Sequence, residues 1–108
     1  MNFKILVSDR FQRQAKRLIK KYPSLKKELS ELRDSLLQDP TMGTPLGHEC
    51  YKIRLAIASK GKGKSGGARV ITYLQVLKNS IFLLSIYDKS EKENITDKEL
   101  QEILKNID

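Results

Sequence analysis

The stretch Tyr51–Tyr87, YKIRLAIASKGKGKSGGARVITYLQVLKNSIFLLSIY, decides the fold. Apolar and polar residues alternate from Tyr51 to Ala58, which predicts a half-buried strand, and Arg69 to Leu77 predicts a second strand. Ile81 to Tyr87 is almost wholly apolar, as is typical of a central strand that is buried on both faces. Lys78-Asn79-Ser80 is a tight turn. The three strands therefore form an antiparallel meander.

Helical patterns flank this stretch on both sides. Phe3 to Val7 has the period of a short strand, and an apolar stripe at helical spacing follows from Phe11 to Tyr22, where a proline ends the helix. A second helix is predicted from Ser24 to Gln38. Thr96-Asp97-Lys98-Glu99 is a capping box that begins the last helix.

These elements predict one α+β domain over residues 1–108, in the order β-α-α-β-β-β-α. The two consecutive helices make a helical hairpin packed on a four-stranded, mainly antiparallel sheet. Prolines and glycines between Asp39 and Gly47 predict an irregular connection from the second helix to the meander.

The composition favours an anionic partner. The net charge is +8 and the pI is about 9.7, which points to nucleic acid, an acidic protein or both. One cysteine, Cys50, is typical of a reducing cytoplasm, and with His48 it does not provide the ligand set of a metal site. No apolar run approaches a membrane span and no signal-peptide pattern follows Met1, so we expect a cytoplasmic protein without a membrane partner, metal or cofactor.

The strongest charge asymmetry lies in the glycine loop, KGKGKSGGAR, from Lys60 to Arg69. This loop holds four of the six glycines, and the interval from Lys52 to Tyr87 contains seven lysines and arginines and no carboxylate. Glycines let backbone amides and cations close on a phosphate, although a solvated hairpin loop has the same composition. The basic helix from Arg10 to Lys21 is a second predicted contact for RNA.

The residue types permit RNA cleavage without histidine. Attack of a ribose 2′-hydroxyl on the adjacent phosphate needs a proton acceptor, cations for the developing charge and a proton donor for the leaving oxygen. A lysine crowded by cations can act as the base, while arginine binds phosphate through two nitrogens. The predicted catalytic residues are Arg54, Arg69, Tyr73, Tyr87 and Lys89. The predicted RNA-binding residues are Arg13, Lys16, Arg17, Lys20, Lys21, Lys52, Lys60, Lys62 and Lys64.

Each predicted catalytic residue also has a plain structural interpretation. Tyr73 and Tyr87 are then aromatic residues at the edge of the core, and Lys89 is a charge on a loop. Arg69 is then a solvated strand residue, and an exposed arginine of this kind contributes little to folding.

Three segments together resemble the RelE/ParE toxin superfamily, and within it the HigB-like branch of RelE-type toxins. They are Lys52-Ile53-Arg54, the loop and strand from Ser59 to Tyr73, and the strand exit from Leu83 to Glu91. The resemblance covers essentially the whole chain and implies a RelE-like fold. It also implies a ribosome-dependent endoribonuclease that cleaves mRNA in the A site and is neutralised by a cognate antitoxin.

The resemblance also assigns roles to individual positions. The phosphate-binding arginine of the family matches Arg69, and its cationic residue at the strand end matches Lys89. Its other basic positions match Arg54 and the lysines of the glycine loop. Ile95 stands where some relatives have a catalytic tyrosine, so Tyr87 or Tyr73 takes that role or the role is absent.

Two other functions remain open at this point. A ParE-like inhibitor of DNA gyrase shares the fold, and a basic binding protein without catalysis shares the charge. Binding of operator DNA through a toxin–antitoxin complex is a further expectation that the sequence leaves open.

Overall fold

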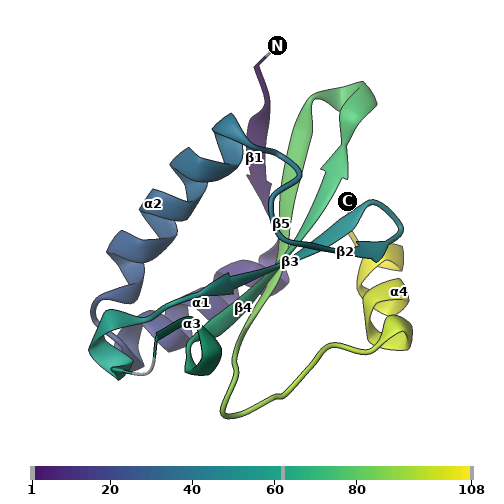
Figure 1. The fold of residues 1–108 in the computed structure, drawn as a ribbon. Helices are drawn as coiled ribbons and strands as arrows, with labels where there is room; N and C mark the ends of the chain where they lie inside the picture. The colour runs from purple at the N-terminus through teal and green to yellow at the C-terminus, as the bar shows by residue number, and fades with distance from the viewer. Residues whose placement is uncertain (1, 62, 108) are drawn as a thin grey trace.

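The computed structural model describes residues 2–61 and 63–107 of the chain. The predicted order of elements is confirmed, with one strand and one short helix added (Figure 1). The elements are β1 (Lys4–Val7), α1 (Asp9–Lys21), α2 (Leu25–Gln38), β2 (Thr44–Gly47), β3 (Cys50–Leu55), α3 (Gly63–Gly66), β4 (Ala68–Gln75), β5 (Ser80–Asp88) and α4 (Asp97–Lys105), with 3-10 turns at Ala58–Lys60 and Val76–Lys78.

The sheet has five strands in the order β1-β5-β4-β3-β2 rather than the four that were predicted. The predicted meander of β3, β4 and β5 is antiparallel, and β1 joins it parallel to β5. The additional strand, β2, pairs with β3 through Thr44 and Pro45. Its composition predicts a loop, but proline and glycine are tolerated on an edge strand because one side of that strand needs no ladder hydrogen bonds.

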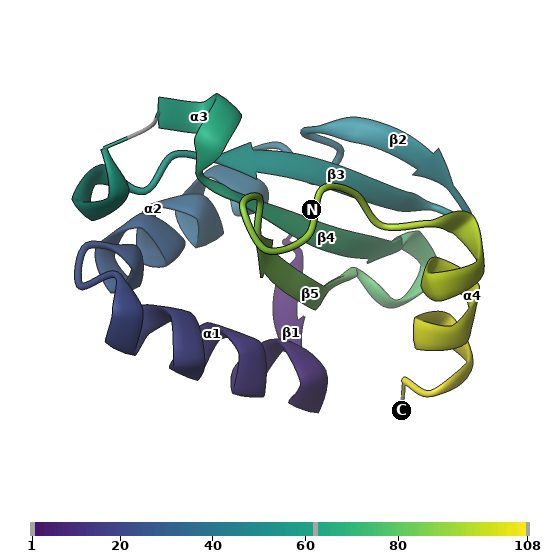
Figure 2. The same ribbon diagram turned by 90° about the horizontal axis from the view of Figure 1, so that it is seen from below.

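Helices cover both faces of the sheet (Figure 2). The helical hairpin α1–α2 buries Phe11, Leu18 and Leu32 against one face, which we call the hairpin face. On the other face, the α4 face, Leu100 and Ile103 pack on the sheet. The predicted Thr96 capping box is complete, and Ser8 caps α1 by accepting a hydrogen bond from the Phe11 amide at 3.1 Å. No helix of the described residues is long and apolar enough to cross a membrane.

Two strand ends differ from the predicted boundaries. β4 ends at Gln75, and the following residues form a 3-10 turn in which Leu77 is fully exposed. β3 ends at Leu55, and the chain then turns toward the hairpin: the Ala58 amide donates to Glu28 Oε2 at 2.7 Å. The period-two pattern continues past both ends, so the pattern alone overestimates the strand lengths.

Asp88, the last residue of β5, is a completely buried carboxylate. Tyr22 Oη donates to it at 2.6 Å, and the Ser90 amide and hydroxyl donate at 2.9 and 2.7 Å. Lys60 completes the set with a buried ion pair, in which only 8% of the lysine side chain is exposed. Burial raises the pKa of the Asp88 carboxyl, but the hydrogen bonds from Lys60, Tyr22 and Ser90 outweigh it and hold the pKa well below its usual range.

Lys60 was predicted to bind RNA, but its side chain is buried in the ion pair with Asp88. Its ammonium neutralises Asp88 and lies 5.7 Å from the centre of the Tyr22 ring, on the hairpin face. The buried pair ties the start of the glycine loop to α1 and to the end of β5. Breaking a buried ion pair costs free energy, because the partner that stays buried is left with a charge that water cannot solvate.

We predict that Lys60→Met lowers the free energy of unfolding by about 3–5 kcal/mol, because it leaves the Asp88 carboxylate buried without its cation. Lys64→Met is the matched control from the same loop: Lys64 is exposed, so its loss should change stability by less than about 0.5 kcal/mol. Adding Asp88→Asn to Lys60→Met should recover part of the loss. Denaturant unfolding measures all three, and equal midpoints for the two lysine variants would contradict the prediction.

Candidate nucleic-acid interface

A basic cavity of about 510 Å³ lies on the α4 face. It is at the end of the sheet where β3 and β5 end and β4 begins. Four of the predicted cations line it, together with three residues that the sequence did not single out. The lining residues are Lys52, Arg54, Arg69, Lys89, Ser65, Glu93 and Asn94.

The pairing of the strands explains why these cations meet. Arg54 lies opposite Arg69 in the β3–β4 ladder, and Arg69 lies opposite Tyr87 in the β4–β5 ladder. Residues that are directly opposite share one face of a sheet. Lys52, two residues before Arg54, lies on the same face by the period of two. Positions far apart in the sequence are thereby stacked across three strands.

Arg69 is buried, with 5% of its surface exposed, so the interpretation of a solvated strand arginine is wrong. Its guanidinium donates to the carbonyl oxygens of Lys64 at 2.8 Å, Ala68 at 3.1 Å and Ser65 at 3.3 Å. Two of these carbonyls belong to the short helix α3 in the glycine loop. Arg69 therefore orders the loop and at the same time keeps a positive charge at the wall of the cavity.

The second half of the glycine loop is packed against the sheet. A Cβ atom at Gly67 would lie 2.1 Å from the Leu55 carbonyl oxygen, so only glycine fits there. The Gly67 carbonyl accepts a hydrogen bond from the Lys89 amide at 3.0 Å. The loop and the end of β5 are thus held side by side, which fixes Lys89 next to Arg69.

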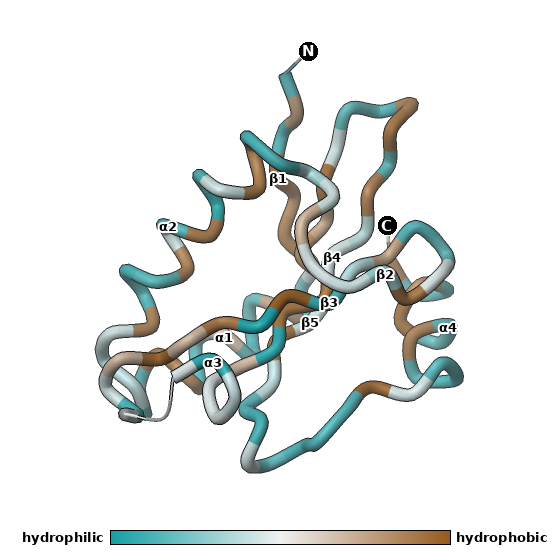
Figure 3. Tube along the Cα trace, viewed as in Figure 1, coloured by the Kyte–Doolittle hydropathy of each residue, from teal (hydrophilic) through white to brown (hydrophobic). Residues whose placement is uncertain are grey.

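The linker between β5 and α4, residues 89–96, forms one wall of the cavity and is largely hydrophilic (Figure 3). Lys89 Nζ donates to the Glu93 carbonyl at 2.8 Å, and Lys52 Nζ donates to Asn94 Oδ1 at 3.3 Å. Two cations of the cavity are therefore oriented by the linker. Sequence reasoning missed Glu93 and Asn94 because residues in an aperiodic linker carry no signal of the face they occupy.

Neither predicted catalytic tyrosine lines the cavity. Tyr87 shares the face of Arg69 but is 5% exposed and packs with Leu100 in the apolar cluster under α4. Burial raises the pKa of the Tyr87 hydroxyl, and the nearby charge of Arg69 partly opposes this. Tyr73 also packs in that cluster, four residues along β4 from Arg69, or about 13 Å at the usual rise of a strand. The structure therefore favours the core interpretation for both tyrosines.

The predicted RNA-binding residues of the glycine loop are separated by the fold. Lys60 is in the buried pair with Asp88, Lys64 is exposed, and Lys62 lies outside the described residues. The cations of α1 are also divided. Arg17 donates to Glu91 at 2.7 Å, and Lys21 lies 3.6 Å from the same carboxylate, so both are partly neutralised. Glu91 raises the pKa of Arg17, as expected for an ion pair.

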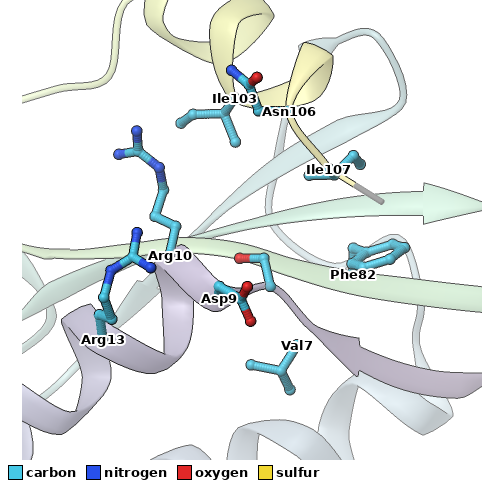
Figure 4. A pocket seen from close by; sticks show the side chains of 9 residues that line it. Val7, Asp9, Arg10, Arg13, Phe82, Ile103, Asn106 and Ile107 are labelled. Atoms are coloured by element: carbon cyan, nitrogen blue, oxygen red, sulfur yellow. The ribbon is translucent and has the colours of Figure 1, made fainter.

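The other α1 cations remain exposed and face different hollows from the basic cavity. Arg13, with Arg10, lines a cavity of about 470 Å³ between the start of α1 and α4 (Figure 4). Lys16 and Lys20 border an apolar groove of about 500 Å³ beside Ile19. The structure does not bring these residues into the basic cavity.

The described residues contain no group of three or more histidine, cysteine or carboxylate side chains placed to ligate a metal. Burial raises the pKa of the Cys50 thiol to about 12, so it is not a nucleophile at neutral pH. The chemistry available in the basic cavity is that of fixed cations around an anion.

Comparisons with known proteins agree with this architecture. A family model described as "RelE toxin of RelE / RelB toxin-antitoxin system" matches residues 3–107. Among solved structures, the chain is similar to an arginine-to-alanine double mutant of the toxin RelE from E. coli in the free state. The TM-score is 0.66 with 19% identity, and the match covers 99% of each chain. At this identity the likeness shows the fold.

We predict that Arg69→Ala destabilises the protein by about 1–3 kcal/mol, because it removes the guanidinium that donates hydrogen bonds to three backbone carbonyl oxygens. Arg69→Lys should fall between the parent and Arg69→Ala, since one ammonium cannot span all three acceptors. Arg54→Ala is the control because Arg54 is exposed. Denaturant unfolding and limited proteolysis of residues 58–67 measure the effect. Equal stability of Arg69→Ala and Arg54→Ala would show that the hydrogen bonds from Arg69 to the three carbonyl oxygens do not stabilise the fold.

Proposed function

Because this chain belongs to the RelE family of toxins from toxin–antitoxin systems, we propose that it is a ribosome-dependent endoribonuclease that cleaves mRNA in the A site. The observation that supports the proposal most directly is the basic cavity. It gathers Lys52, Arg54, Arg69 and Lys89 on one face at the end of the sheet. The family implies an antitoxin as the partner that neutralises the toxin.

In the proposed reaction the cavity holds the scissile phosphate. Arg54 is exposed and free to close on a phosphate oxygen, whereas Arg69 is already fixed by the loop carbonyls. Cations that are fixed before the substrate arrives stabilise developing negative charge without reorganising, which is the largest single contribution in many enzymes. The 2′-hydroxyl attacks phosphorus, the 5′-oxygen leaves, and the proton passes from the first oxygen to the second through groups of the cavity.

In this proposal two lysines of the cavity carry out that proton transfer. Lys52 and Lys89 are each hydrogen-bonded to an acceptor on the linker, Asn94 Oδ1 and the Glu93 carbonyl respectively. A neutral lysine amine accepts a proton and an ammonium donates one. The exposed cations of α1 and of the glycine loop supply long-range attraction to RNA, which depends on salt concentration.

Dependence on the ribosome is tested by expressing the chain without an antitoxin. We expect translation to stop and a translated reporter mRNA to show 5′ ends positioned by codon in primer extension. The same mRNA with its start codon removed should stay intact, because the ribosome presents the substrate. Equal cleavage of naked RNA would refute ribosome dependence. Loss of DNA supercoiling with intact mRNA would identify a gyrase inhibitor instead, and binding without cleavage would identify a non-catalytic basic protein.

The role of the cavity is best tested at Arg54, because the side chain of this arginine is exposed. We predict that Arg54→Gln lowers the single-turnover cleavage rate by about 10²–10³, the usual effect of losing one electrostatic contact with the transition state. Arg33→Gln is the matched control, since Arg33 is an exposed arginine of α2 on the hairpin face. Both variants should unfold at the parent midpoint. Cleavage by Arg54→Gln at the rate of Arg33→Gln would place the chemistry elsewhere.

A further inference from the structure

The alternation of side chains is interrupted once in the central meander, in β5. Along the first part of β5, Leu83 packs on the hairpin face and Leu84 on the α4 face. Strict alternation would then put Ile86 on the α4 face. Ile86 instead packs on the hairpin face, and Tyr87 packs on the α4 face. The strand therefore changes phase between Leu84 and Ile86.

The register of the β4–β5 ladder shows the cause. Ile71 pairs with Ser85, but the next residue, Thr72, pairs with Leu83, so β5 contains one extra residue, Leu84. This is a β-bulge, which bends a strand and redirects the side chains that follow. The β3–β4 ladder is continuous, so the change of phase belongs to β5.

Gln14 of α1 is bonded to this bulge. Its side-chain oxygen accepts a hydrogen bond from the Ser85 hydroxyl at 2.9 Å and one from the Ile86 amide at 3.0 Å. A buried amide that leaves the ladder costs free energy unless another group accepts its proton. A glutamine on the helix that crosses β5 supplies that acceptor.

The change of phase decides which residues reach the basic cavity. Because the side-chain period of a strand is two, a shift of one residue exchanges the two faces. With the bulge, Asp88 lies on the hairpin face beside Tyr22 and Lys60, while Lys89 lines the cavity beside Arg69. Without it, Lys89 would point toward the hairpin and Asp88 toward the cavity, where a carboxylate would repel phosphate.

We propose that Gln14 is a positioning residue for RNA cleavage, which acts by holding the β5 bulge that directs Lys89 into the basic cavity. The inference rests on the proposed function. Gln14 is on the opposite face of the sheet from the cavity, so it affects the reaction through the backbone of β5 and not by touching RNA.

The test compares Gln14→Leu, which keeps the size of the side chain without an acceptor, with Gln14→Glu, which keeps an acceptor oxygen. Gln12→Leu is the control, because Gln12 is an exposed glutamine of the same helix. We expect Gln14→Leu to lower the saturated single-turnover rate by about 10²-fold, as small misplacements of reacting groups do, with RNA affinity within about twofold of the parent. Gln14→Glu should restore most of the rate, and Gln12→Leu should be unchanged.

A structural readout keeps the inference testable when cleavage is absent. Hydrogen–deuterium exchange of the Ile86 amide should be about tenfold faster in Gln14→Leu than in Gln12→Leu, because the amide loses the Gln14 oxygen that accepts its hydrogen bond. The nuclear Overhauser contact between the Tyr87 ring and Leu100 should weaken. If Gln14→Leu does not fold, Ser85→Ala removes one of the two hydrogen bonds and should give a smaller loss of rate in the same direction.

Two outcomes would overturn the inference. One is a Gln14→Leu protein with the rate and the Ile86 exchange of Gln12→Leu. The other is a loss of rate that only follows the unfolded fraction or that Gln14→Glu does not restore. A parent protein that cleaves no RNA, with Ile86 exchange accelerated as expected, would refute the nuclease function and leave the role of Gln14 in directing Lys89 intact.

Discussion

The buried carboxylate of Asp88 is the constraint on which the cavity depends. It sits at the end of the central strand and is held by Tyr22 from α1, by Lys60 from the glycine loop and by Ser90 from the linker. A charge without water must be matched by nearby donors, so the three segments cannot separate without a large penalty. Lys89, which follows Asp88, and Arg69, which follows the ladder partner of Asp88, Ala68, are consequently fixed relative to each other.

The cavity therefore gathers cations on a rigid frame in spite of its glycine-rich surroundings. Carbonyl oxygens of the loop solvate Arg69, which lessens the repulsion between neighbouring cations. Lys52 and Lys89 are similarly satisfied by the linker. In the proposed reaction, a phosphate would meet charges that are largely held in position before it binds, and this preorganisation is what electrostatic catalysis requires. The exposed Arg54 is the cation of this set with most freedom to adjust.

Much of the fold follows from local pattern. The meander, the helical hairpin and the capping box of α4 are each encoded by residues close together in the sequence, so period, proline and caps predict them. The edge strand β2 was missed because its proline and glycine are typical of loops. The bulge in β5 was missed for a different reason: Ile81 to Ile86 is buried on both faces and apolar except for Ser85, so the hydrophobic pattern does not show the change of phase. Only the pairing partners reveal that Leu84 is an extra residue.

The sequence by itself determined the α+β class, the basic character and the cations that line the cavity, because charge and periodicity are properties of residue types and their spacing. The tertiary structure decided what each charged group does. Lys60 neutralises a carboxylate 28 residues away, and Arg17 pairs with Glu91, 74 residues away. Arg69 is buried against its own loop, Tyr87 is buried in the apolar cluster under α4, and Tyr73 is half-buried against that cluster. These outcomes depend on which groups lose water and which partner replaces it, and that is settled only when distant segments pack together.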